Sequence, residues 1–348
     1  MRLRAKASAL ACAAATAVAT TMPSFAQESI RMATSWPGGL FLDSFAKGFA
    51  NNAEKLTNGK VKFQVFPGGT IGSALKVTET VQKKIAPSGN ASPNYDWGVD
   101  KTGVIFAGYV GSPGIEAHLH WLYEAGGAKM WAEWRMEKFG LVALPCGAHS
   151  DEIHMHSRKP VTKPEDLKGL KLRTAGAWAE VAASLGASTV ILAGGEVYPA
   201  LERGVVDAIE WGTPAINLPL GFHKIAKYVI LPGLHQPAAV QECIFDKGLW
   251  DGFDPHTRVL LEEAAKKTTL ESWMSLTYQD TGALGKYKED GAEVLYVEPS
   301  YVEAVRKATR EWEEKTAAEN AWFKKALESK REFETRWNGA KGYRSEFK

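Results

Sequence analysis

The segment from Pro255 to Asp290 restricts the possible architecture of this chain more than any other stretch. It reads PHTRVLLEEAAKKTTLESWMSLTYQDTGALGKYKED, and after the opening proline the only breakers are Gly282 and Gly285, near its end. A run of this kind is typical of one very long helix, or of two nearly continuous ones. Such a helix is longer than a single small domain needs. We therefore expect it to lie across two domains.

Strand and helix patterns alternate along the chain ahead of this segment. The strand-like stretches are IRMATSW, KVKFQVFPG, LVALPCGAH, LKGLKLRT and STVILA, and helical patterns separate several of them. A further long helix is expected at Tyr301–Leu327. Alternation of this kind is typical of an α/β protein with mostly parallel or mixed sheets. A chain of 348 residues usually forms two domains around two cores.

The first 26 residues have the pattern of a Sec-type signal peptide. Arg2, Arg4 and Lys6 form a basic start, an apolar run too short to span a membrane follows, and Ser-Phe-Ala at 24–26 fits a cleavage site. Its removal leaves 348 − 26 = 322 residues and lowers the formal charge from +2 to −1, because three basic and no acidic side chains are lost. We expect a periplasmic protein without a nucleic-acid or anionic-membrane partner.

Two cysteines remain in the mature chain, Cys146 and Cys243, each in a strand-like stretch. This number excludes a disulfide-rich scaffold. An oxidising compartment permits one bridge between them. Two buried free thiols are the other interpretation, and the sequence alone leads us to favour it.

His149, Glu152, His154 and His156 form the densest cluster of titratable residues. Histidines two residues apart on a strand share a face, and Glu152 has the same parity. Metal motifs of high specificity have other spacings. We interpret the cluster as surface histidines that lie close by chance, and a metal-dependent hydrolase built on Glu152, His154 and His156 is the alternative.

Known catalytic patterns are absent from the chain. It has no serine-hydrolase elbow, no zincin motif, no P-loop and no dinucleotide-binding glycine pattern. Without a recognisable pairing of nucleophile and base, the sequence predicts that the protein is not an enzyme.

Arg173 ends the strand-like stretch GLKLRTAG, and a Gly/Ala-rich turn after it leaves room for a ligand. The planar guanidinium group matches a carboxylate with two parallel hydrogen bonds. A second stretch, GEVYPALERGVVDAIEW at 195–211, ends by delivering Glu210 and Trp211 into a Gly/Pro-rich turn. An exposed arginine and a surface corner are the alternatives to a binding site.

The stretch from GLKLRTAG through STVILAGGEVYPALERGVVDAIEW resembles the substrate-binding subunit of tripartite ATP-independent periplasmic (TRAP) transporters. The later stretch GFHKIAKYVILPGLHQP is similar to the branch of 2-oxo-acid and lactate-binding receptors. The resemblance covers nearly the whole mature chain. It implies a two-domain periplasmic solute-binding fold with mixed β-sheets, hinge strands and a long helix that bridges the domains. It also implies a receptor that hands an organic acid to membrane permease subunits.

The resemblance implies a division of the chain. Domain I is expected at 28–148 plus 238–275, domain II at 149–237 plus 276–320, and a C-terminal helical tail at 321–348. The stretches VALPCGAH and AAVQECIFD become strands that cross between the domains. Similar tails mediate dimers in this branch, so a homodimer through the C-terminal helix is expected; packing of the tail on its own chain is the alternative.

Site residues follow from the same resemblance, position by position. Arg173 matches a carboxylate-binding arginine, and Glu210 and Trp211 match a pair that helps to bind a metal ion beside the substrate. Trp211 would give its backbone carbonyl to the ion and its ring to the pocket wall. Gln236 matches a further metal ligand, and Glu152 matches a ligand that touches both metal and acid. The branch more often has Gln at the earlier and Glu at the later of these two positions, so the two side chains are exchanged here.

Charge also argues for a cation. Glu152, Glu210 and a substrate carboxylate give −3, and Arg173 returns +1. A buried charge of −2 is very unfavourable, so a cation is required or a glutamate must take up a proton. Ligands that are all oxygen select a hard ion. The expected cofactor is Ca²⁺ or Na⁺, and Ca²⁺ is preferred because it brings the sum to zero.

The opposite wall of the pocket is expected from the loop APSGNASPNYDWG at 86–98, where the family places substrate contacts. Its candidates are Asn94, Tyr95 and Trp97; Trp36 and Phe106 have less support. Aromatic side chains at this density suit a ligand larger than pyruvate as well as pyruvate itself. The expected ligand is a 2-oxo or 2-hydroxy monocarboxylate, aliphatic or aryl, and another organic acid such as a sugar acid is the alternative.

Overall fold

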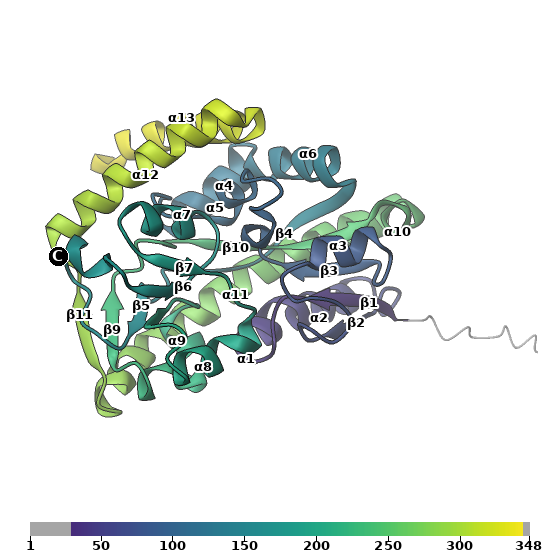
Figure 1. Ribbon diagram of the computed structural model, residues 1–348. Helices are drawn as coiled ribbons and strands as arrows, with labels where there is room; N and C mark the ends of the chain where they lie inside the picture. Colours follow the sequence, from purple (N-terminus) through teal and green to yellow (C-terminus); the bar gives the residue numbers. More distant parts are fainter. Residues whose placement is uncertain (1–28, 344–348) are drawn as a thin grey trace, which may run out of the picture.

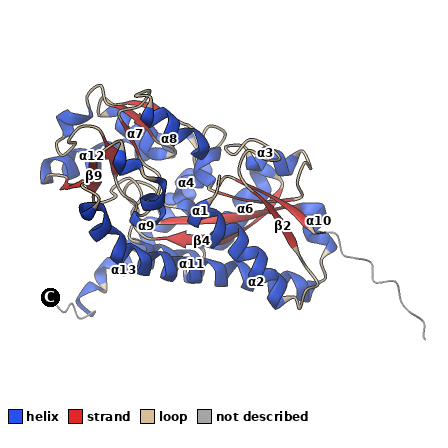
Figure 2. Ribbon diagram, turned by 90° about the horizontal axis from the view of Figure 1, so that it is seen from below, coloured by secondary structure: helices blue, strands red, loops and turns tan. Residues whose placement is uncertain are grey.

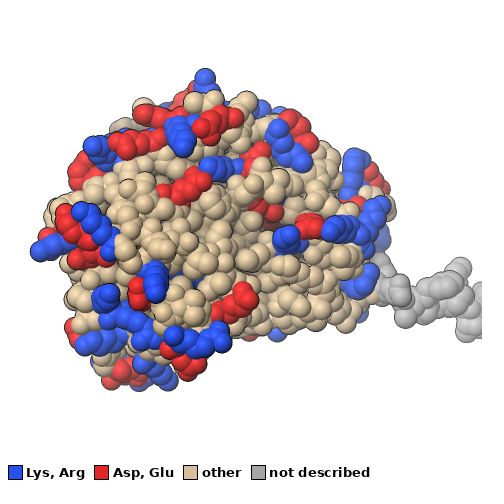
Figure 3. All heavy atoms as spheres, viewed as in Figure 1, with Lys and Arg blue, Asp and Glu red and all other residues tan. Residues whose placement is uncertain are grey.

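The computed structural model describes residues 29–343, which form an α/β fold of two mixed sheets with helices packed around them (Figure 1). The expected fold class is confirmed. The predicted signal peptide lies outside the described residues. Lys and Arg side chains are interspersed with Asp and Glu over the face in Figure 3, as the near-neutral charge predicts. No helix within 29–343 combines the length and the apolar composition needed to cross a membrane.

The first sheet has five strands in the order β2-β1-β3-β10-β4. β1 pairs in parallel with β2 and β3, and β10 runs antiparallel between β3 and β4. The strands are β1 (Ile30–Thr34), β2 (Phe63–Phe66), β3 (Ser88–Ala91), β4 (Leu141–His149) and β10 (Ala239–Asp246). The helices and turns of this part are α1 (Gly39–Phe41), the π-helical η1 (Leu42–Lys47), α2 (Gly48–Leu56), α3 (Val77–Gln82), the 3-10 turn η2 (Pro93–Asp96), α4 (Gly103–Ala107), α5 (Ile115–Glu124), α6 (Gly127–Phe139) and α10 (Lys247–Gly252).

The second sheet has six strands in the order β11-β9-β5-β8-β6-β7. β6 is parallel to β7 and β8, whereas β5 is antiparallel to β8 and β9. The strands are β5 (Met155–Ser157), β6 (Lys171–Arg173), β7 (Ser188–Val190), β8 (Ala208–Ile209), β9 (Tyr228–Leu231) and β11 (Glu293–Tyr296). Around them lie η3 (Pro164–Leu167), α7 (Ala177–Ser184), α8 (Gly194–Glu202), α9 (Pro214–Asn217), η4 (Leu218–Leu220) and η5 (Phe222–Lys224).

The predicted long helix is one continuous element, α11 (Pro255–Glu289), of 35 residues. Asp254 caps its start by accepting a hydrogen bond from the Thr257 N–H, and the proline follows at the first helical position, where no N–H is needed. α11 packs on β4 and α2 beside the first sheet and on α9 and β11 beside the second. Figure 2 shows it extending from the side of α2 to the side of α9.

The C-terminal part corrects one expectation. Two helices, α12 (Pro299–Glu319) and α13 (Ala321–Gly339), replace the single helix expected at Tyr301–Leu327, and η6 (Lys341–Tyr343) follows. Asn320 leaves the helical conformation, with φ −135° and ψ 110°, and its side chain accepts a hydrogen bond from the Phe323 N–H. This N-cap breaks the helix. α12 packs on α7, whereas α13 packs on α4, α5 and α6.

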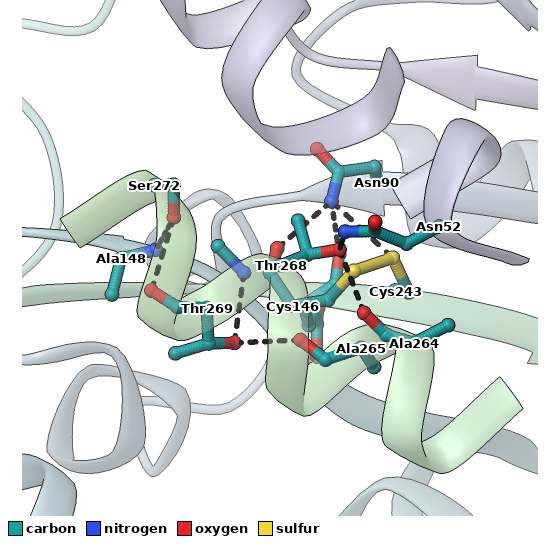
Figure 4. The surroundings of a disulfide bond; sticks show 12 residues. Asn52, Asn90, Cys146, Ala148, Cys243, Ala264, Ala265, Thr268, Thr269 and Ser272 are labelled. Atoms are coloured by element: carbon teal, nitrogen blue, oxygen red, sulfur yellow. Dashed lines mark hydrogen bonds between the residues drawn. A yellow bond between two sulfur atoms is a disulfide. The ribbon is translucent and has the colours of Figure 1, made fainter. Parts of the chain in front are cut away.

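The two cysteines correct a second expectation. Cys146 and Cys243 form a disulfide, with their Cα atoms 5.3 Å apart, so the free thiols that we favoured are wrong. The residues lie 97 positions apart in sequence but on adjacent antiparallel strands, β4 and β10. Figure 4 shows the bond beneath Asn90, whose side-chain amide donates to the Cys146 carbonyl. On the α11 side, Thr269 and Ser272 accept hydrogen bonds from the N–H groups of Gly147 and Ala148.

Candidate ligand and cation site

A cavity of about 50 Å³ lies between the two sheets. One wall is the edge of the second sheet at the ends of β6 and β8, and the other is formed by η2, the start of β10 and the residues that follow β1. The structure brings seven of the eight predicted site residues to this cavity, and only Trp97 lies outside it. The seven that line it are Asn94, Tyr95, Glu152, Arg173, Glu210, Trp211 and Gln236.

Arg173 and Glu210 meet because β6 and β8 are parallel neighbours that end at the same edge of the sheet, with Arg173 paired to Ile209. The guanidinium Nη1 donates to the Glu210 carbonyl at 2.8 Å and to its carboxylate Oε1 at 3.2 Å. Nη2 donates to the Leu192 carbonyl at 2.9 Å. The Trp211 ring lies against the group, 5.1 Å from Cζ to the ring centroid. Arg173 is only 1% exposed, so its charge requires an anionic partner.

Glu210 is buried and its two carboxylate oxygens have different surroundings. Oε1 accepts from the Arg173 guanidinium and from the Ala175 N–H at 3.0 Å. Oε2 has neither contact and lies 3.8 Å from Nε2 of His235. One oxygen is therefore fixed by donors, and the other faces the second carboxylate group of the site.

Glu152 lies between β4 and β5 and is 7% exposed. Its Oε2 is 3.0 Å from Nε2 of His235, and its Oε1 is 3.5 Å from Nε2 of His149. Burial raises the pKa of Glu152 to about 7, against the opposing effect of His235. The carboxylate thus lies where a negative charge is poorly compensated.

His149 adds to this deficit of positive charge. Burial lowers the pKa of His149 to about 4, so the ring is neutral at pH 7. Its Nδ1–H donates to the Ser150 carbonyl at 2.8 Å, which leaves Nε2 without a proton. Within 29–343 this Nε2 has no hydrogen-bond partner, although it faces the Glu152 carboxylate. Two acceptors that face each other in a buried corner favour a cation nearby.

Gln236 presents a single free atom to the cavity. Its amide nitrogen donates to the Gly108 carbonyl at 2.8 Å and to the Ala238 carbonyl at 2.7 Å. The carbonyl Oε1 is the part of the side chain that remains for a ligand. A carboxylate in the same place would face two carbonyl oxygens, which explains why an amide suits this position in this chain.

His235 is a site residue that the sequence analysis missed. With Glu152 and Glu210 it forms a group whose possible ligand atoms all lie within 4.8 Å of one another. It lies directly before Gln236 in the stretch GFHKIAKYVILPGLHQP. The signal was therefore present in the sequence, but nothing there indicated that its ring turns toward Glu152.

The histidine cluster at 149–156 is not a surface cluster, which corrects that interpretation. His149, His154 and His156 are all fully buried. Burial lowers the pKa of His154 well below its usual range and that of His156 to about 3. His156 accepts a hydrogen bond from the Asn217 amide, and His154 faces His235. Neither belongs to the group of ligand atoms formed by Glu152, Glu210 and His235.

Aromatic side chains close the rest of the cavity. Tyr95 and Asn94 enter from η2, Trp36 follows β1, and Phe41, which we had not predicted, packs on Trp211 at 5.6 Å between ring centroids. Burial raises the pKa of Tyr95, so its hydroxyl is neutral at physiological pH.

Two aromatic candidates lie elsewhere. Trp97, the residue after η2, faces Lys101, whose Nζ is 5.7 Å from the ring centroid. Phe106 is fully buried and stacks on Trp121 and Trp131 in the core.

The donor set can hold a cation and a small anion together. Glu152, Glu210 and the Gln236 Oε1 offer oxygen atoms, and the only guanidinium at the described cavity belongs to Arg173. A carboxylate placed against Arg173 would lie beside the cation. These residues fit the metal ion that the sequence analysis expects.

Comparisons with known proteins agree with this chemistry. The family model described as bacterial extracellular solute-binding protein, family 7, matches residues 32–320. A protein named monocarboxylate 2-oxoacid-binding periplasmic protein, from Nostoc sp., is 26% identical over 315 residues, which are 88% of this chain and 85% of the relative.

Two solved structures have the same fold over most of their length. A TRAP transporter solute-binding protein from Bordetella bronchiseptica, with calcium and picolinate bound, has a TM-score of 0.85 at 25% identity, covering 89% of this chain and 93% of that one. A TRAP periplasmic solute-binding protein from Pseudoalteromonas atlantica, with sodium and pyruvate bound, has a TM-score of 0.85 at 25% identity, covering 90% and 96%.

Proposed function

This chain belongs to family 7 of the bacterial extracellular solute-binding proteins, the receptor subunits of TRAP transporters, and we propose that it binds a 2-oxo or 2-hydroxy monocarboxylate together with a cation. In this proposal the receptor works in the periplasm and delivers the acid to membrane permease subunits. The family consists of solute receptors and not of enzymes.

The observation that carries the proposal is the placement of Arg173 and two buried glutamates, Glu152 and Glu210, around one cavity. The carboxylate of the acid pairs with the guanidinium group. Its 2-oxo or 2-hydroxy oxygen and one carboxylate oxygen chelate the cation that Glu152 and Glu210 hold. The cation neutralises the negative charge of Glu152 and Glu210, and the acid neutralises the positive charge of Arg173. We therefore expect the acid and the cation to bind cooperatively.

The cation is divalent in this proposal. Glu152, Glu210 and the acid contribute −3 and Arg173 contributes +1, so an ion of +2 closes the balance. Glu152, Glu210, the Gln236 Oε1 and the Trp211 carbonyl would hold it, and oxygen donors suit Ca²⁺. The ion supplies a fixed positive charge for the 2-oxo or 2-hydroxy group. The relatives were solved with calcium in one case and sodium in the other.

The cavity volume of about 50 Å³ favours the compact members of the class. One water molecule requires about 10–15 Å³ by the same measure, so a few non-hydrogen atoms fill the space. Trp36, Phe41 and Trp211 limit any side chain beyond C3. We therefore place pyruvate- and lactate-sized acids ahead of aryl acids.

A binding experiment tests the proposal. Metal-stripped protein is titrated calorimetrically with pyruvate, lactate, 2-oxobutyrate, phenylpyruvate and glucuronate, each with Ca²⁺, with Na⁺ and with EDTA. We expect the small 2-oxo or 2-hydroxy acids to bind most tightly with Ca²⁺ and at least tenfold more weakly in EDTA. Binding of the sugar acid alone, or equal affinity in EDTA, would refute it.

The quaternary structure stays a prediction. α13 buries Phe323, Ala326 and Leu327 against its own chain, which supports the alternative that the tail packs within one subunit. The exposed residues of α13, such as Lys324 and Glu328, would be accessible to a second subunit in the predicted homodimer. Light scattering of the full chain measures which form exists in solution.

A further inference from the structure

Behind Glu152 a line of buried polar groups leads away from the cavity. The Tyr301 hydroxyl lies 2.8 Å from Nε2 of His154, and Nδ1 of His154 lies 3.3 Å from Nδ1 of His235. Nε2 of His235 then lies 3.0 Å from the Glu152 Oε2. Tyr301 and His154 are fully buried and His235 is 3% exposed. The line therefore connects the first turn of α12 to the carboxylate without a break to solvent.

The available donors and acceptors determine which group donates in each hydrogen bond of this line. Among residues 29–343 the Tyr301 hydroxyl has one hydrogen-bond partner, His154 Nε2. A buried O–H needs an acceptor, so it donates to that nitrogen. His154 has no carboxylate at either ring nitrogen and carries one N–H, which must then lie on Nδ1 and donate to His235. His235 in turn carries its N–H on Nε2 and donates to Glu152.

The opposite direction leaves groups unsatisfied. If His154 donated to the tyrosine, the Tyr301 O–H would have no acceptor among the described residues. His235 would then donate from Nδ1 and turn a bare nitrogen toward the Glu152 carboxylate at 3.0 Å. A buried polar group without a hydrogen-bond partner is unfavourable, so this direction is disfavoured. Only this opposite direction, in which Nε2 of His235 carries no proton, would allow His235 to act as a nitrogen ligand of the cation.

We propose that His235 is a positioning residue, which donates a hydrogen bond to Glu152 and holds its carboxylate toward the cation and the acid, and that Tyr301 fixes this role through His154. This inference rests on the proposed function for the identity of the ligands. It assigns the imidazole to Glu152 and leaves the cation a set of oxygen ligands, Glu152, Glu210, Gln236 and the Trp211 carbonyl. Second-sphere donors of this kind change metal affinity by about 10–100-fold.

Nitrogen NMR of the ligand-free protein tests the direction. In the ¹⁵N-histidine-labelled chain we expect an Nδ1–H tautomer for His154 and an Nε2–H tautomer for His235, with His235 unchanged when Ca²⁺ is added. The Tyr301→Phe variant loses the fixed donor and should show mixed tautomers for both rings. A bare Nε2 on His235, or a wild-type pattern in Tyr301→Phe, would overturn the proposal.

Ligand affinity tests the positioning role. His235→Gln keeps an N–H donor near the original Nε2, whereas His235→Leu removes it at similar volume. We expect His235→Gln to retain the wild-type Kd for Ca²⁺ within about threefold and His235→Leu to lose about 10–100-fold. Tyr296→Phe, at a tyrosine that is 67% exposed, is the matched control for Tyr301→Phe. Equal affinities for His235→Leu and wild type would contradict the role.

The proposed function and the proposed role of His235 can be tested independently of each other. The tautomers are measured without acid or metal, so they do not depend on which acid the receptor takes. If the wild-type protein bound no 2-oxo acid but showed the expected tautomers, the proposed function would fall and the direction of the line would stand. A lowered ligand-free Tm identifies any variant whose loss of affinity comes from misfolding.

Discussion

Protein oxygen atoms accept hydrogen bonds from the guanidinium group of Arg173 and fix its position. Two of them are oxygens of Glu210 and the third is the Leu192 carbonyl, so the guanidinium plane is fixed against Trp211. An acid that binds as proposed would therefore require little reordering of this long side chain. Pre-organisation of this kind is one source of affinity for a small ligand.

Replacement of Arg173 by lysine should weaken acid binding. Lys keeps the charge but loses the planar fork, and we expect affinity to fall about 10–100-fold, which is about 1.4–2.8 kcal/mol. Calorimetry with Ca²⁺ present measures the change. Arg31→Lys, at an exposed residue of β1, is the control. Affinity equal to wild type in Arg173→Lys would show that the acid does not pair with this residue.

Asp280 of α11 allows a pH prediction. Its Oδ1 accepts from the Ala215 N–H at 2.7 Å, and burial raises its pKa to about 6. The unfolded value is lower, near 3.8. The charged form is therefore disfavoured in the folded protein, and this residue costs stability as the pH rises from about 4 through about 6.

Asp280→Asn keeps the acceptor and removes the charge. At pH 8 we expect the free energy of unfolding of the variant to be about 1 kcal/mol larger than that of wild type, a value that allows for the partial solvent access of the residue. At pH 4 we expect the two free energies of unfolding to be equal. Urea titrations at the two pH values measure this. Asp43→Asn, at an exposed residue, should show no such gain. A variant that is less stable than wild type at pH 8 would contradict the prediction.

At the scale of single residues, the sequence predicted contacts that depend on neighbouring strands and missed those that depend on distant ones. The ends of two parallel strands bring Arg173 to Glu210, and both were named beforehand. His235 was not named, because its orientation depends on Tyr301, which is far along the chain. Trp97 lies outside the cavity because the 3-10 turn η2 ends just before it.

Among the elements, the loop between α4 and α5 positions the Gln236 side chain by accepting a hydrogen bond from its amide group. Gly108 of this loop has φ +92°, and a Cβ there would lie 2.0 Å from the Ala238 carbonyl oxygen. The same glycine offers its own carbonyl to the Gln236 amide. The close approach of loop and strand therefore requires glycine.

Gly108→Ala should destabilise the fold and the site together. The left-handed φ and the clash with backbone atoms give an expected loss of about 2–4 kcal/mol in the free energy of unfolding. Urea unfolding measures it, and calorimetry should show weaker Ca²⁺ binding. Gly114→Ala is a control in the same loop, since a Cβ there has nothing within 4 Å. Equal losses in the two variants would show that the tight contact is unimportant.

The elements also mark the limits of sequence reasoning. The long helix was predictable because its signal is local: a capped start and few breakers over many turns. The disulfide was not, since the pairing of β4 with β10 is a property of the sheet. The break at Asn320 depends on one side chain that accepts from the Phe323 N–H, and the helical pattern on both sides concealed it.

Across the whole molecule, contacts outside the described cavity join parts that belong to different sheets. Lys101, from the segment after η2, pairs with both carboxylate oxygens of Glu180 on α7 at 2.8 Å. Trp312 of α12 donates to the same carboxylate. Both partners are about one-third exposed. A ligand that enters by separation of the two sheets would break the pair of Lys101 with Glu180.

Lys101→Met should therefore change ligand release more than stability. Loss of a partly exposed pair costs about 0.2–1 kcal/mol, so we expect the dissociation rate of the acid to rise up to about fivefold, with an unchanged association rate and ligand-free Tm. Stopped-flow fluorescence measures the rates. Lys129→Met, which removes a pair within α6, is the control. A slower association rate in Lys101→Met would indicate a role in capture instead.

The continuous backbone of α11 constrains how such a receptor can move. An unbroken helix of 35 residues is about 52 Å long and resists stretching, because each turn is closed by its own hydrogen bonds. It packs against both sheets, so it works as a strut of fixed length between them. The two halves cannot draw apart along this direction. We therefore expect them to swing about the strut or to flex it, so that an opening for the proposed acid would form on the side of the molecule that the helix does not cross.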